Sequence, residues 1–191
     1  IPAISSITGL GSAVQNKGLL EKLTKRLYKW GFKEVEHVFF QNTANLNYFL
    51  DNNVIKDNYS LISGSGVNLD KFKVLDYPKN DKLVITYIGR LMEDKGTNEL
   101  LDAAKHFKDK DINIKFNIVG FFMNENTELY KRVMLYNDKG IINFLGRTNN
   151  VIPYIKESDV IINPSYHEGM SNILLEAAAS GRPVLASNIP G

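Results

Sequence analysis

The stretch "LVITYIGRLMEDKGTNELLDAAKHFKDKDINIKFNIVG", residues 83 to 120, predicts the fold class of this chain. It begins with an apolar run at 83–89 that is typical of a buried strand. Apolar residues at helical spacing follow at Leu100, Ala103, Ala104 and Phe107. Polar and apolar residues then alternate strictly from 112 to 118, as in a strand with one buried face. A strand, a helix and a strand in this order predict a parallel pair joined by a crossover helix.

The same alternation of strands and helices continues to the end of the chain. Further strands are expected at 141–146, 159–165 and 183–187. Further helices are expected near 127–138, near 151–157 and after Ser171. Five strands and four helices in strict alternation predict an α/β, Rossmann-like domain over 83–191, with a parallel sheet covered by helices on both faces.

A shorter array of the same kind precedes this domain. Its strands are expected at 2–7, 35–40 and 59–66, and its helices near 17–30 and 43–52. We interpret 1–66 as the end of a second Rossmann-like domain. Residues 67–82 lack periodicity and are rich in Lys, Asp and Pro, which predicts a linker between the two domains.

Composition excludes several classes of protein. The chain has 191 residues, of which 43% are hydrophobic and 23% are charged, as in an ordinary globular protein. Lys and Arg total 23 against 21 Asp and Glu, so the net charge of +2 gives no general attraction to nucleic acid. Cysteine is absent, which excludes disulfides and thiolate metal sites. No apolar run approaches the ~20 residues needed to cross a bilayer. Because the chain begins with Ile1 and ends directly after a strand, we expect a piece of a longer protein.

The informative loops should follow the strands, because ligands of open parallel sheets bind beyond the carboxyl ends of the strands. Three of these loops begin with a glycine, which lets the backbone approach a ligand closely: Gly89, Gly120 and Gly146. The loop at 89–97 also carries Arg90 and Lys95, whose cationic groups would suit a diphosphate. The alternative is that both are solvated and pair with acidic neighbours in the loop. The loop lacks the Walker A pattern, so nucleoside triphosphate hydrolysis is not indicated.

Two carboxylates mark the helix in "HEGMSNILLEAAASGRPV", residues 167–184. Backbone N–H groups at the start of this helix, residues 169–172, would form an anion site. Glu168 and Glu176 would flank a diphosphate held there and could accept hydrogen bonds from hydroxyl groups, as on a nucleotide sugar. The alternative gives Glu168 and Glu176 no ligand: Glu168 compensates the helix dipole, Ser171 caps the helix and Glu176 is solvated.

Four segments in this order resemble the retaining glycosyltransferases of family 4, which have the two-domain GT-B fold. They are "ISGSGVNLDKF", "YIGRLMEDKGTNELLDAA", "FLGRTNNVIPYIKESDVIINPS" and "HEGMSNILLEAAASGRPVLASNIPG", the last of which contains an E-x7-E spacing. The segments "TGLGS" (8–12) and "FFQNTANLNYFL" (39–50) further resemble the subgroup that builds capsule, O-antigen and related glycans on lipid carriers. One departure concerns Ser5 and Ser6, where related sequences often have a histidine.

The resemblance implies a role for each candidate residue. Arg90 and Lys95, after Gly89, would hold the diphosphate of the donor, and Glu168 would bind hydroxyls of the donor sugar. Glu176 would bind the ribose. The resemblance implies that backbone N–H groups are offered to the donor by Gly169, Met170, Ser171 and Asn172. It places Gly146 and Arg147 near the base.

The implied enzyme transfers a sugar from a UDP-sugar to a lipid-carrier-linked glycan and needs no cofactor or metal. The sequence "DKD" at 109–111 precedes a strand, where a solvated turn is expected, and no His pair has metal-ligand spacing. A non-catalytic nucleotide-sugar-binding module and a sugar-nucleotide epimerase remain open, because similar folds serve both. The chain alone is expected to bind a nucleotide without transferring sugar.

The helix expected at 17–30 is basic and amphipathic. It has Leu20, Leu23 and Leu27 on one face and five basic residues around the rest. We expect the leucines to pack on the sheet. In the alternative, the helix lies on an anionic membrane surface, which would suit a lipid-linked acceptor. We expect a cytoplasmic protein, which in this alternative is peripheral at the inner face of the cell membrane.

Overall fold

A computed structural model describes residues 2–10 and 18–190 and divides the chain into two compact units. Unit 1 comprises Ile1–Gly66, His167–Ser171 and Ile189–Gly191. Unit 2 comprises Val67–Tyr166 and Asn172–Asn188. Gly11 and Ser12 of the "TGLGS" segment, and Lys17 at the start of the expected basic helix, lie outside the described residues.

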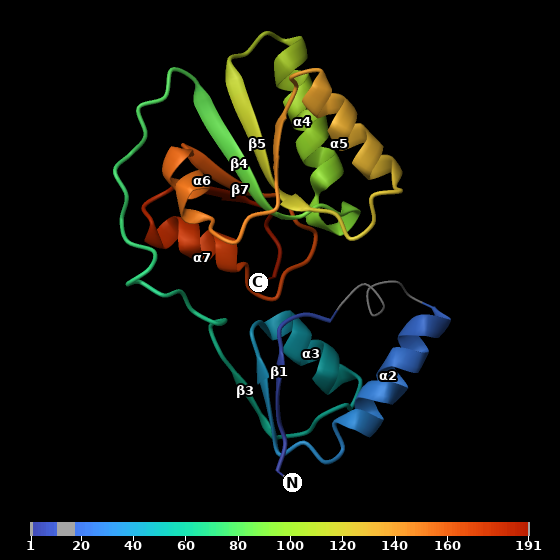
Figure 1. The fold of residues 1–191 in the computed structure, drawn as a ribbon. Helices are drawn as coiled ribbons and strands as arrows, with labels where there is room; N and C mark the ends of the chain where they lie inside the picture. The colour runs from blue at the N-terminus through green and yellow to red at the C-terminus, as the bar shows by residue number, and fades with distance from the viewer. Residues whose placement is uncertain (1, 11–17, 191) are drawn as a thin grey trace. The chain divides into compact units, whose positions relative to one another are not determined.

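Unit 1 contains a parallel sheet with the strand order β1-β2-β3 (Figure 1). Its elements are β1 (Ile4–Ile7), α2 (Leu19–Gly31), β2 (His37–Phe40), α3 (Thr43–Asp51) and β3 (Tyr59–Leu61). The predicted order of elements is confirmed, although β3 is shorter than the predicted strand. It ends before Gly64 and Gly66, whose φ angles of 73° belong to the left-handed region, and a strand cannot continue through that conformation.

The expected packing of the α2 leucines on the sheet is wrong. Leu20, Leu23 and Leu27 are 56%, 53% and 57% exposed, and the helix contains no buried residue. The side of α2 that faces the core carries Tyr28 instead, whose ring centroid lies 5.1 Å from that of Phe49. Helical periodicity identified an apolar stripe correctly, but it does not specify which side of a helix contacts the sheet.

Unit 2 contains a parallel five-stranded sheet with the order β6-β5-β4-β7-β8, which confirms the predicted Rossmann-like alternation. The strands are β4 (Leu83–Arg90), β5 (Ile114–Phe121), β6 (Asn143–Gly146), β7 (Val160–Asn163) and β8 (Val184–Ala186). The helices are α4 (Thr97–Asp109), α5 (Glu128–Asp138), α6 (Ile152–Glu157) and α7 (Asn172–Ala179), with a short 3-10 turn, η1 (Glu93–Lys95), before α4.

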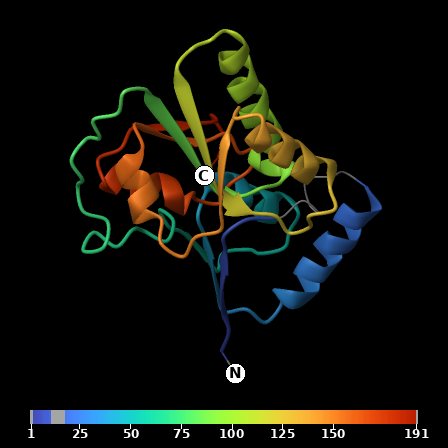
Figure 2. The same cartoon turned by 45° about the horizontal axis from the view of Figure 1, so that its top comes forward.

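Helices cover both faces of this sheet. Figure 1 and Figure 2 show α4 and α5 side by side on one face, while Figure 1 shows α6 and α7 on the other. The first face is sealed by a cluster that includes Leu101 and Ile118, both 0% exposed. The second is sealed by a cluster that includes Ile155 and Ile161, also 0% exposed. Burial of both faces explains the nearly continuous apolar run in β4.

The segment 67–82 packs against the second face. Phe72 is buried in the same cluster as Ile155. Arg182, only 3% exposed, donates from its guanidinium to the carbonyl oxygens of Leu75 and Asp76 at 3.2 and 2.5 Å, and to that of Ile155 at 3.0 Å. A buried guanidinium is stable here because backbone carbonyls accept its N–H groups. The interdomain role of 67–82 stays a prediction.

The crossover connections bring the carboxyl ends of the parallel strands to one edge of the sheet. β4 ends at Arg90, β5 at Phe121, β6 at Gly146 and β7 at Asn163. The loops that follow these four strands therefore start from the same edge. Over the described part of the chain, no helix has the length and apolar character needed to span a bilayer.

Candidate functional site

A pocket of about 300 Å³ lies at the carboxyl edge of the unit 2 sheet, among the ends of β4 and β5 and the loop after β6. Three of the candidate residues line it: Gly89, Arg90 and Arg147. Other lining residues come from the same strand ends and the loop at 147–151: Ile88, Val119, Gly120, Phe121, Thr148, Asn149 and Val151. The structure thus brings together residues that lie almost 60 positions apart in the sequence.

Two paired glycines form the floor of this pocket. Gly89 of β4 is the register partner of Gly120 of β5. A Cβ atom at Gly120 would lie 1.9 Å from the carbonyl oxygen of Gly89, and a Cβ at Gly89 would lie 2.8 Å from the hydroxyl of Tyr87. A side chain would therefore clash at both of these pocket-lining positions.

The buried Tyr87 holds the backbone at the pocket wall. Its hydroxyl donates a hydrogen bond to the carbonyl oxygen of Arg90 at 2.6 Å, and its side chain is 2% exposed. Because Tyr87 belongs to the core, this bond anchors the last residue of β4 to a rigid part of the sheet. The Arg90 guanidinium is exposed and starts from this anchored position.

The opposite wall combines a cation with an aromatic ring. The guanidinium of Arg147 lies over the ring of Phe121, 4.8 Å from its centroid. Gly146, directly before Arg147, has a φ of 70°, which a glycine adopts without strain. The sequence had suggested the loop of Phe121 but not Phe121 itself. The available signal was an aromatic residue directly after the glycine that ends an apolar strand.

Lys95 lies in the 3-10 turn after β4, outside the lining of this pocket. The buried Thr97 closes the turn, because its hydroxyl donates to the carbonyl of Met92 at 3.0 Å and accepts from the Met92 N–H at 3.2 Å. The Lys95 N–H also donates to Met92 O at 3.1 Å. The backbone that carries the Lys95 side chain is therefore held by three hydrogen bonds within residues 92–97.

The same turn contacts the loop after β7. The N–H of Tyr166 donates to the carbonyl of Asp94 at 3.0 Å, and the Tyr166 hydroxyl donates to Glu99 Oε1 at 2.7 Å. A Cβ atom at Gly96 would lie only 2.1 Å from the carbonyl oxygen of Pro164. These contacts join the loop that carries Lys95 to the loop that leads towards Glu168.

Residues 167–171, which include the candidates Glu168, Gly169, Met170 and Ser171, pack within unit 1. A Cβ at Gly169 would lie 1.5 Å from the carbonyl oxygen of Thr8, so only glycine fits this position. The side-chain amide of Asn42 donates to the carbonyl oxygens of Glu168 and Gly169 at 3.3 and 3.0 Å. The sequence had not identified Asn42 or Thr8 as partners of this segment.

Asn42 also belongs to the local structure of unit 1. Its Oδ1 accepts the backbone N–H of Asn45 at 2.8 Å and caps α3, while its Nδ2 holds the 168–169 carbonyls. One side chain therefore connects the start of α3 to the segment that carries Glu168. The Asn42 cap was visible in the sequence only as a polar residue before a helix.

The remaining candidates, Asn172 and Glu176, lie on α7 of unit 2. Glu176 is half-buried, next to the fully buried Ala177. Burial raises the pKa of the Glu176 carboxyl above its ordinary value, and the ammonium of Lys71 opposes part of this rise. The structure therefore places Gly89, Arg90 and Arg147 together. It places Glu168 in a different unit from Glu176, so a shared site for the two carboxylates stays a prediction.

The "DKD" sequence lies at the amino edge of the unit 2 sheet. Asp109 is the last residue of α4, and Asp111 lies in the turn before β5. Both are therefore remote, along the strands, from the carboxyl ends that form the pocket.

Known proteins resemble this chain in both sequence and structure. The family model described as glycosyl transferases group 1 matches residues 82–191. The chain is 27% identical, over 97% of its length, to the N,N'-diacetylbacillosaminyl-diphospho-undecaprenol alpha-1,3-N-acetylgalactosaminyltransferase of Campylobacter jejuni, of which it covers 52%. It is 34% identical, over 66% of its length, to the UDP-Gal:alpha-D-GlcNAc-diphosphoundecaprenol alpha-1,3-galactosyltransferase of Escherichia coli, of which it covers 36%.

Solved structures show the same fold. HepE of Anabaena, crystallised with UDP-glucose, superposes with a TM-score of 0.79 at 16% identity, covering 98% of this chain and 53% of HepE. The chain thus spans about half of the length of HepE and of the Campylobacter relative, and less of the Escherichia relative. This structural similarity confirms the expected α/β fold of GT-B type.

Proposed function

Because the chain belongs to the glycosyl transferases of group 1, we propose that the whole protein is a retaining glycosyltransferase with a UDP-sugar donor. Its acceptor is a lipid-carrier-linked glycan in surface polysaccharide biosynthesis. The names of the Campylobacter and Escherichia relatives both include a diphospho-undecaprenol compound, and the name of the Escherichia protein also includes UDP-Gal. The observation that carries the proposal is the pocket at the carboxyl edge, with its glycine floor and its Arg90 and Arg147 walls.

In this proposal the donor diphosphate lies against the end of β4. Arg90 supplies a planar fork of N–H donors and Lys95 a point charge, so both offset the negative charge that grows on the leaving nucleotide. The anchored backbone of both residues limits the reorganisation needed as this charge develops. Fixed cations aimed at a developing charge contribute most of the electrostatic stabilisation in such sites.

The base of the nucleotide lies in the pocket of about 300 Å³. Gly89 and Gly120 line this pocket and carry no side chain that a planar ring would meet. The Arg147 and Phe121 pair forms the wall along which the ring stacks. This arrangement assigns Gly146 a positioning role, because its left-handed conformation turns Arg147 onto the Phe121 ring.

The two carboxylates serve different parts of the donor. Glu176 accepts hydrogen bonds from the ribose hydroxyls, and Glu168 accepts them from the sugar that is transferred. The backbone N–H groups of Gly169, Met170, Ser171 and Asn172 face the diphosphate. Glu168 belongs to unit 1, whereas Arg90 and Glu176 belong to unit 2.

No metal ion takes part in the proposed reaction. The charges at the diphosphate are the side chains of Arg90 and Lys95. They stabilise the nucleoside diphosphate as its bond to the sugar breaks, while the oxocarbenium-like sugar forms a bond to a hydroxyl of the acceptor. UDP-sugar is the donor substrate, and no further cofactor is required.

The lipid-linked acceptor places the protein at the cytoplasmic face of the membrane. The exposed leucines of α2, together with the exposed Trp30 at 79%, form an apolar stripe. Lys22, Arg26 and Lys29 are exposed beside this stripe. An exposed apolar stripe with basic flanks matches an anionic bilayer surface, and we assign the peripheral contact to α2.

Calorimetric titration of UDP and of a UDP-sugar tests the assigned carboxylates. Glu176→Ala is expected to weaken both ligands by about tenfold to a hundredfold, because both contain the ribose. Glu168→Ala is expected to leave UDP binding nearly unchanged and to weaken only the UDP-sugar. Glu34→Ala, an exposed glutamate before β2, is the matched control and should affect neither ligand. Equal effects of the Glu168 and Glu176 variants on UDP would contradict the assigned roles.

A further inference from the structure

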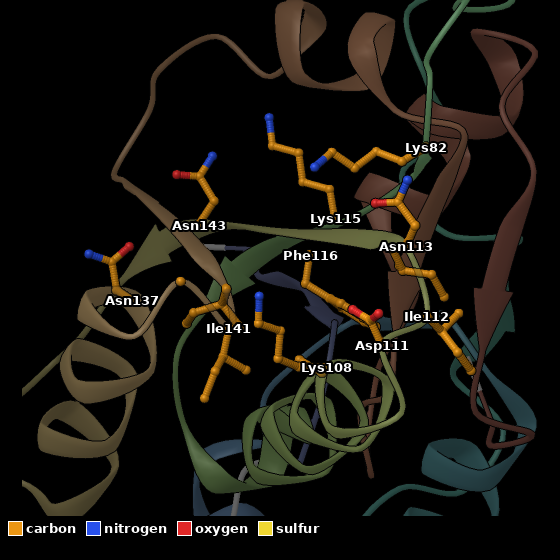
Figure 3. A pocket seen from close by; sticks show the side chains of 14 residues that line it. Lys82, Lys108, Asp111, Ile112, Asn113, Lys115, Phe116, Asn137, Ile141 and Asn143 are labelled. Carbon is orange, nitrogen blue, oxygen red and sulfur yellow. The ribbon is translucent and has the colours of Figure 1, made fainter.

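A second pocket lies at the opposite, amino edge of the unit 2 sheet and has a volume of about 640 Å³ (Figure 3). It is bounded by the residue before β4, the first residues of β5 and β6, and the ends of α4 and α5. Ligands of the sheet itself bind at the carboxyl ends of the strands. This pocket is therefore distinct from the donor site proposed above, and nothing in the transfer reaction uses it.

Lysines dominate the charge of this pocket. Lys82, Lys108 and Lys115 line it, and Asp111 is the single carboxylate among the lining residues. In Figure 3, Lys82 and Lys115 extend to one side of β5, and Lys108 and Asp111 lie on the other side. Lys82 directly precedes β4, Lys108 lies in α4 and Lys115 lies in β5. The cluster therefore arises from the tertiary fold and not from a local run of basic residues.

The three pocket lysines differ from two other lysines of unit 2, which lie on α4 and α5. Lys105 of α4 pairs with Asp109, and Lys131 of α5 pairs with Glu128 at 2.6 Å. Within residues 2–10 and 18–190, none of the three pocket lysines forms an ion pair. Like charges gathered around one cavity repel each other, and a bound anion removes this repulsion.

Side-chain amides complete the polar lining. Asn137 accepts the Phe144 N–H on its Oδ1 at 2.9 Å, which leaves its NH2 group to donate. Asn143 donates from its Nδ2 to Asn117 Oδ1 at 3.0 Å, which leaves its own Oδ1 to accept. The pocket therefore offers fixed donors and acceptors of the kind that hydroxyl groups use, besides the cations that a phosphate uses.

From these observations we propose that the amino-edge pocket is an accessory site for a small sugar phosphate. The phosphate lies between Lys82 and Lys115, which extend to the same side of β5, and the sugar hydroxyls bond to Asn137 and Asn143. The volume falls within the range of about 300–1,000 Å³ that is typical of small-molecule sites and exceeds what a bare phosphate would fill. The exposed Ile112, at 45%, gives the sugar ring an apolar edge to cover.

Binding is tested by calorimetry of the unmodified protein with glucose 1-phosphate, glucose and inorganic phosphate. Glucose 1-phosphate is expected to bind saturably, phosphate about tenfold more weakly, and glucose not detectably. Equal affinity for phosphate and glucose 1-phosphate would overturn the sugar part of the assignment. The absence of binding up to about 10 mM would overturn the site, because weak complexes are detected in the millimolar range.

Variants locate the ligand. The pair Lys82→Gln and Lys115→Gln is expected to weaken glucose 1-phosphate by about tenfold or more, because two charge-assisted contacts are lost. The matched pair Lys105→Gln and Lys131→Gln removes the same charge from paired, exposed lysines and should leave the affinity within about twofold. Equal losses in both pairs would show a general charge effect and overturn the proposal.

Two further measurements separate this site from the donor site and from misfolding. Saturating UDP is expected to leave glucose 1-phosphate binding unchanged, whereas competition would place the sugar phosphate at the carboxyl edge and overturn the proposal. In the unmodified protein, glucose 1-phosphate should slow acetylation of Lys82 and Lys115 by an amine-reactive reagent, relative to Lys131, as read by mass spectrometry. Equal acetylation with and without the ligand would contradict the assigned residues without any variant.

Discussion

Gly96 and Pro164 are in such close contact that a Cβ atom at Gly96 would lie 2.1 Å from the Pro164 carbonyl oxygen. Gly96 follows Lys95, and Pro164 directly follows β7. Gly96 also has a φ of 68°, in the left-handed region that side chains disfavour. Two independent reasons therefore require glycine at the point where the loop of Lys95 meets the loop after β7.

We expect Gly96→Ala to lower the free energy of unfolding by about 3 kcal/mol or more, because backbone strain and a steric clash add. Urea unfolding measures the loss. Gly140→Ala is the matched control, since Gly140 has a φ of 61° and open space around its Cβ position. It should lose only the strain component, about 1–2 kcal/mol. Equal losses would show that the Pro164 contact has no cost of its own.

Lys95→Ala tests the proposed cation at the diphosphate. In the complete enzyme, the variant is expected to lose about 1.5–3 kcal/mol of transition-state stabilisation, or roughly tenfold to a hundredfold in kcat/KM. Steady-state transfer assays with a UDP-sugar measure this effect. Lys131→Ala, on the exposed face of α5, is the control and should retain full activity. Unchanged kcat/KM in a folded Lys95 variant would show that this lysine does not stabilise the transition state.

The raised pKa of Glu176 predicts a pH-dependent effect on stability. A carboxyl whose pKa is higher in the folded state binds its proton more tightly when folded, so its contribution to stability increases as pH falls through the interval above the ordinary carboxyl pKa. At neutral pH the charged, half-buried group is unfavourable. Glu176→Gln is therefore expected to unfold at a higher temperature than the unmodified protein at neutral pH.

Thermal unfolding at several pH values measures this difference, which should shrink as the pH approaches the ordinary carboxyl range. Glu34→Gln, at an exposed position before β2, is the matched control. A difference that grows as the pH falls would have the wrong sign and would contradict burial as the cause of the shift.

Chelation tests the proposed metal-independent transfer. If Arg90 and Lys95 supply the charge at the diphosphate, the transfer rate in the complete enzyme should be unchanged by about 10 mM EDTA, beyond its effect on ionic strength. A sodium chloride control matched in ionic strength isolates that effect. Loss of transfer in EDTA that manganese or magnesium restores would show that an ion shares this role.

Local patterns in the sequence were sufficient for the elements and for the edge of the sheet that carries the pocket. The periodicity of 83–120 predicted β4, α4 and β5, because burial of a strand or a helix face repeats at a fixed interval. Gly89 and Arg90 were identified because strand ends in a parallel sheet meet at one edge. These inferences needed only neighbouring residues and a general rule of α/β architecture.

Contacts between distant residues depended on the tertiary structure. The Phe121 ring under Arg147 and the Asn42 amide on the Glu168 carbonyl join positions 26 and 126 residues apart, and no local pattern specifies such pairs. The outward face of the α2 leucines and the lysine pocket at the amino edge also emerged only there. The physical reason is that hydrophobic periodicity indicates which face of a helix or strand is apolar enough to be buried. The packing of whole helices and strands against one another decides which residues each side chain contacts.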